Sequence, residues 1–84
     1  MKHLSFKLKY ADKRWQQYLE ETFGKETSEK FSIEGNATAK TNEATVNLIN
    51  FDGNKEIINT IKNDKNIISA YIIENNTVKK VIVA

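Results

Sequence analysis

The 84-residue chain contains no cysteine and no proline, three glycines and a single histidine. Without cysteine it can form neither disulfides nor thiolate metal sites, and it lacks a thiol nucleophile. The glycines are scattered, which excludes a glycine-rich phosphate-binding loop. His3 has no second histidine or cysteine to join it, whereas metal and catalytic sites need several convergent groups. We therefore expect no catalytic, cofactor-binding or metal-binding residue, no cofactor and no enzymatic activity.

Charge and hydropathy indicate an ordinary globular chain. Hydrophobic residues make up 39% of the sequence and charged residues 29%, and the formal net charge is +2. The longest nearly apolar stretch, Ile67–Ile73, is too short to cross a bilayer, and no signal peptide is visible. A net charge this small does not indicate a nucleic-acid or membrane partner. We expect a cytoplasmic location, with no direct membrane insertion of this segment.

Length and termini bear on the domain organisation. Eighty-four residues suffice for one small hydrophobic core, so the chain 1–84 is predicted to be a single domain. The sequence begins almost in one strand pattern and ends inside another, at Val81–Ala84. Because natural chains more often carry a few loose terminal residues, we expect a domain excised from a longer protein.

Apolar spacing predicts the secondary structure. Leu4, Phe6 and Leu8 alternate with polar residues, which is typical of a half-buried strand. From Trp15 to Phe23 the apolar residues follow helical spacing, and Gly24 is suited to end that helix. The expected elements, in chain order, are strand 4–10, a helix capped by Asp12 over 15–23, strand 31–35, strand 44–49, a helix capped by Asp52 or Asn54 and running to about Asp64, strand 67–74 and strand 78–83, with loops at 25–30 and 36–43 and a tight turn at Asn75-Asn76.

This order, β-α-β-β-α-β with an extra C-terminal strand, predicts the α+β class. It is the order of the ferredoxin-like sandwich, in which two helices lie on one face of an antiparallel sheet. In the usual strand order, the second strand lies at one edge of the sheet and the added strand at the other.

Such a sheet leaves one face open, and its expected side chains are more apolar than an idle surface needs. If Leu4, Phe6 and Leu8 face the helices, then Ile49, Tyr71 and Ile73 point the other way. The final strand offers a second candidate surface, because its edge is unpaired. The candidate interface residues are Ile49, Tyr71, Ile73, Val81 and Val83. The alternative is that a neighbouring element or the 36–43 loop covers the face.

The segment 46–74 resembles a known family. A strand ends in a polar turn, the short helix Glu56–Ile61 follows, and then comes the strand Asn66–Ile73 with the sequence NIISAYII. This pattern is similar to the second half of ACT-like regulatory domains, in particular the soluble C-terminal domain of MgtC-type membrane proteins. The resemblance implies a regulatory domain appended to a membrane protein. Asn66 stands where those domains often have glycine, so no functional residue is carried over.

Two functions remain open on the sequence. The first is a non-catalytic regulatory or assembly module that acts through its sheet face or edge strand, by self-association as a homodimer or by binding another protein. The second is a small nucleic-acid-binding module, because RNA-recognition domains share this topology. Those domains carry aromatic residues on the central strands in a basic-glycine-aromatic context. The segment Lys40–Ile49 has neither the glycine nor the aromatics, which argues against the second function.

Overall fold

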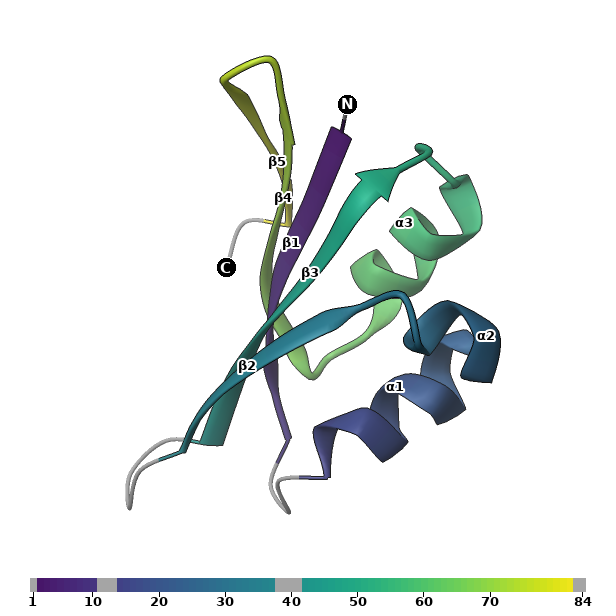
Figure 1. The fold of residues 1–84 in the computed structure, drawn as a ribbon. Helices are drawn as coiled ribbons and strands as arrows, with labels where there is room; N and C mark the ends of the chain where they lie inside the picture. The colour runs from purple at the N-terminus through teal and green to yellow at the C-terminus, as the bar shows by residue number, and fades with distance from the viewer. Residues whose placement is uncertain (1, 11–13, 38–41, 83–84) are drawn as a thin grey trace.

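The computed structural model describes residues 2–10, 14–37 and 42–82 as a two-layer α+β fold (Figure 1). A five-stranded antiparallel sheet forms one layer and three helices form the other. The elements, in chain order, are β1 (Lys2–Lys9), α1 (Trp15–Phe23), α2 (Lys25–Ser28), β2 (Ser32–Ala37), β3 (Asn42–Phe51), α3 (Lys55–Asn63), β4 (Ile67–Glu74) and β5 (Thr77–Ile82).

The strand order is β2-β3-β1-β4-β5, and every neighbouring pair is antiparallel. The expected edge positions are therefore confirmed, with β2 at one edge and β5 at the other. The tight turn before β5 is also confirmed. Asn75 and Asn76 have φ angles of 51° and 66°, and this left-handed backbone is tolerated by asparagine and joins strands in two-residue hairpins.

The helices lie on one side of the sheet and cover its apolar side chains (Figure 1). Leu4, Phe6 and Leu8 of β1 are 0–1% exposed, as the alternation predicts. Phe6 meets the rings of Phe23 and Phe31, whose centroids lie 6.0 and 5.7 Å away. This aromatic cluster joins the central strand to α1 and to the start of β2, and so fixes which face of the sheet is buried.

The helix ends follow local capping chemistry. Asn54, one of the two expected caps of α3, accepts a hydrogen bond from the backbone N–H of Glu56 at 2.8 Å. Asp52, the other, instead accepts from the backbone N–H of Asn54 at 2.9 Å. Gly24 ends α1 with a φ of 89°. Asp12, the expected cap of α1, lies outside the described residues.

Two expected loops are corrected. The segment 25–30 contains the helical turn α2, in which the backbone N–H of Ser28 bonds to the carbonyl of Gly24 at 3.0 Å. The sequence pattern did not predict this turn, because its residues are polar and α2 has no apolar stripe of its own. The loop expected over 36–43 is shorter at both ends, since β2 reaches Ala37 and β3 begins at Asn42. Backbone pairing extends the strands there through polar residues.

Candidate interaction surface

The sheet face opposite the helices is the main candidate site, and we call it the open face. Cross-strand partners share a face, so the register sorts its side chains into rows. Three of the rows span most of the sheet. The apolar row is Ile49, His3, Ile73 and Val78; the tyrosine row is Ser32, Asn47, Ser5, Tyr71 and Lys80; the lysine row is Glu34, Thr45, Lys7 and Ser69.

The apolar row runs over β3, β1, β4 and β5, with His3 between its aliphatic members Ile49 and Ile73. Its two outer members, Ile49 and Val78, are 59% and 58% exposed, and they are the large hydrophobic residues that stand out as exposed in the described part of the chain. Ile73 between them is half-buried. Three aliphatic side chains gathered along one row of an open sheet face are a feature of association surfaces rather than of idle surface.

His3 occupies the middle of the apolar row, on the central strand. Its Nε2 atom lies 3.1 Å from Oδ1 of Asn47, its diagonal neighbour on β3, and the ring donates when the proton is on Nε2. This hydrogen bond holds the imidazole against the sheet. The row is therefore continuous in shape, with one polar group at its centre.

The tyrosine and lysine rows are polar and enclose a small hollow. It has a volume of about 170 Å³ and is lined by Ser5, Phe6, Lys7, Thr45, Ser69 and Tyr71. The hollow lies over β1, where the short side chain of Ser5 leaves space beside the longer Tyr71. Its size suits one side chain rather than a small-molecule ligand, since ligand pockets are typically about 300–1,000 Å³.

Charged side chains lie at both edges of the open face and on its inner strands. Glu34 lies on β2 at one edge and Lys80 on β5 at the other, and both are exposed. Lys7 lies between them on β1. Opposite charges at opposite edges are complementary when one such face meets another in reversed strand order.

The predicted interface residues fall in three places. Ile49, Tyr71 and Ile73 lie on the open face, as expected from the alternation. Val81 is half-buried and packs against the hydrophobic core, because it follows Lys80 of the open face and successive side chains of a strand point to opposite faces. Val83 lies outside the described residues.

Val78 belongs to the surface but was missing from the predicted set. The sequence did contain a signal for it. A two-residue turn at Asn75-Asn76 pairs Glu74 with Thr77 and hence Ile73 with Val78, which puts the two aliphatic side chains on one face.

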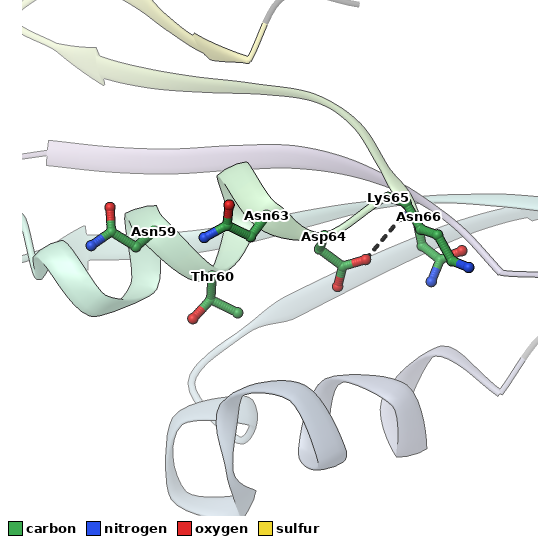
Figure 2. Close-up of a pocket in the computed structure, with 6 residues that line it drawn as sticks. All are labelled: Asn59, Thr60, Asn63, Asp64, Lys65 and Asn66. Carbon is green, nitrogen blue, oxygen red and sulfur yellow. Dashed lines mark hydrogen bonds between the residues drawn. The ribbon is translucent and has the colours of Figure 1, made fainter.

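A larger depression on the described surface lies elsewhere, along α3 and the turn that follows it. It has a volume of about 560 Å³ and is lined by Asn59, Thr60, Asn63, Asp64, Lys65 and Asn66. Figure 2 shows that Asn59 and Thr60 point in different directions from the helix instead of converging. A wide, open and polar hollow without convergent groups is not organised for chemistry.

The polar groups at the end of this depression have a structural role. Tyr18 of α1 donates its hydroxyl hydrogen to Asp64, and Nδ2 of Asn66 donates to the Tyr18 oxygen at 3.3 Å. Asp64 also accepts from the backbone N–H of Asn66 at 2.9 Å (Figure 2). The cluster thus ties the first helix to the turn before β4, and its donors and acceptors are used within the fold.

Within the described ranges, no group of three or more His, Cys, Asp or Glu residues is placed to hold a metal ion. No helix in that part of the chain is long and apolar enough to cross a bilayer. In comparisons with known proteins, the chain matches no family, no curated protein and no solved structure.

Proposed function

We propose that the chain is a non-catalytic assembly or regulatory module of ferredoxin-like topology that binds protein through its open face. The strand order β2-β3-β1-β4, with β5 added beside β4, supports the ferredoxin-like description. In this proposal the domain is cytoplasmic and serves as a regulatory domain of the ACT-like kind, appended to a membrane protein.

The observation that carries the proposal is the apolar row. Full burial of an aliphatic side chain is worth about 1.5–3 kcal/mol, and Ile49 and Val78 are mostly exposed. A protein partner on this face would remove both from water together with Ile73. The apolar row itself carries no lysine, arginine, aspartate or glutamate, and charge is depleted in the same way at the core of protein interfaces.

The face is favoured over the edge strand as the contact surface. The outer strand β5 carries Lys79 and Lys80, and its pairing with β4 shifts register near Tyr71. Lysine and irregular pairing on an edge strand both oppose the addition of another strand. Val81, the apolar residue expected at that edge, packs against the core.

The same surface argues against nucleic-acid binding. Tyr71 is the aromatic residue of the three open-face rows, and the outward residues of β1 and β3 offer no ring except the imidazole of His3. Single-stranded nucleic acids are held mainly by stacking on several aromatic rings in a basic groove. Glu34 and the apolar row do not fit such a groove.

Photo-cross-linking from the open face tests the proposal. A photo-reactive phenylalanine derivative would replace Val78, and a matched control would carry it at exposed Gln17 on α1. We expect protein adducts from position 78 but not from position 17. Excess unlabelled protein should compete the adducts away, and excess Ile73→Ser protein should not. Equal adducts from both positions, or none from position 78, would contradict the proposal.

A further inference from the structure

We propose that the occupant of the open face is a second copy of this chain, docked about a two-fold axis that runs parallel to the strands between β1 and β4. This inference rests on the proposed function and names its partner. A two-fold contact requires a self-complementary surface. The register allows that requirement to be checked row by row.

A two-fold rotation about this axis keeps each row at the same height along the strands and reverses the order of the strands. Each row of one copy therefore faces the same row of its partner. Strand β1 of one copy then lies over β4 of its partner, and β3 lies over β5. In the apolar row, Ile49 meets the partner's Val78 and His3 meets the partner's Ile73. By symmetry the four contacts bury every aliphatic side chain of the row on both copies.

The tyrosine row is also self-complementary. Its Ser5 lies opposite the partner's Tyr71, and its Asn47 lies opposite the partner's Lys80. The hollow of about 170 Å³ lies over β1 beside Ser5, where the partner's Tyr71 ring arrives. An aromatic side chain seated in a hollow of the facing surface is the usual anchor of a protein interface.

Charge and apolar contact favour this axis over two others that lie nearer β3. With the axis between β1 and β4, Lys7 faces the partner's Ser69. Lys80 lies between Asn47 and Glu34 of the partner copy. An axis through β1 would instead stack Lys7 on its own counterpart, which places like charges together. An axis between β1 and β3 would leave Ile73 and Val78 without apolar partners.

The size of the contact indicates a weak, reversible dimer. Four overlapping strands about 4.8 Å apart and three rows about 7 Å apart cover roughly 400 Å² on each copy. Stable specific interfaces usually bury about 800 Å² per partner. Self-association is therefore expected in the high micromolar range, and tests should be made at that concentration.

Single-cysteine cross-linking tests the arrangement, because the natural chain has no cysteine to interfere. Positions 49 and 78 lie three strands apart in one copy, about 14 Å, but face each other between copies. We would treat Ile49→Cys protein, Val78→Cys protein and their equal mixture with a short bis-maleimide. Each variant would be repeated with Ile73→Ser added as the matched control.

We expect covalent dimers containing one chain of each variant, formed at least fivefold faster in the mixture than in either variant alone. Ile73→Ser should reduce this rate to that of random collision. Equal rates in all three samples, or no cross-link at high micromolar concentration, would overturn the inference. If photo-cross-linking from position 78 still captures a different protein, the proposed function stands and only the second copy is rejected.

Discussion

The indole ring of Trp15 in α1 lies directly against the backbone of Gly35 in β2, where any larger residue would place its Cβ atom. The two residues join the first helix to an edge strand of the sheet. Because the ring fills the space, Gly35 is required here by close approach rather than by a turn.

Replacing Gly35 by alanine should therefore destabilise the protein by about 1–3 kcal/mol, the usual cost of overpacking. Urea unfolding followed by fluorescence measures this directly, since Trp15 is the chain's single tryptophan. As a control, the same substitution made beside Trp15→Leu and followed by circular dichroism should cost less. An equal cost in both backgrounds would contradict the contact.

Loss of the Tyr18 hydroxyl should weaken the tie between α1 and the turn before β4. In Tyr18→Phe, Asp64 and Asn66 each lose a hydrogen-bond partner, and a cost of about 1–2 kcal/mol is expected. Tyr10→Phe is the matched control, because the Tyr10 ring stacks on Tyr18 at 4.7 Å without a role for its hydroxyl in this cluster. Urea unfolding should show the larger loss for Tyr18→Phe, and equal losses would count against the cluster.

The stability of the protein should depend on which residue occupies position 76 in the turn between β4 and β5. Asn76 has a φ of 66°, and glycine adopts such a backbone with less strain than asparagine. Asn76→Gly is expected to leave stability unchanged or raise it by a few tenths of a kcal/mol, because the gain in fit is offset by chain entropy. Asn76→Val should instead cost about 1–2 kcal/mol, since a β-branched residue is strained there. Thermal unfolding distinguishes the two variants, and a Val variant as stable as the Gly variant would contradict the turn.

Periodicity in the sequence was sufficient to predict which face of the sheet is buried and where most of the helices and strands lie. The alternation around Phe6 and the helical spacing from Trp15 depend on local pattern, and both were read correctly. The hairpin turn at Asn75-Asn76 also follows from local backbone chemistry. These features are set by residues close together in the chain, so one sequence is enough to find them.

Features that depend on contacts between residues far apart in the chain could not be predicted from local sequence patterns. The helical turn α2 is polar and is placed by Ser28, which is fully buried against the fold. The β4–β5 pairing shifts by one residue between Ala70 and Tyr71, and no local sequence pattern predicts such a shift. The matching of rows across the open face likewise needs the register of four strand pairs.

The most direct test of the central claim is a nuclear Overhauser measurement between the methyl groups of Ile49 and Val78 at high micromolar concentration. Within one copy these residues lie on β3 and β5, separated by β1 and β4, which is about 14 Å and too far for direct transfer. A cross-peak between them can therefore arise only between copies. We expect that cross-peak at pH 8 and its loss in Ile73→Ser. Its absence from a sample whose other methyl groups give strong signals would contradict a dimer through the open face.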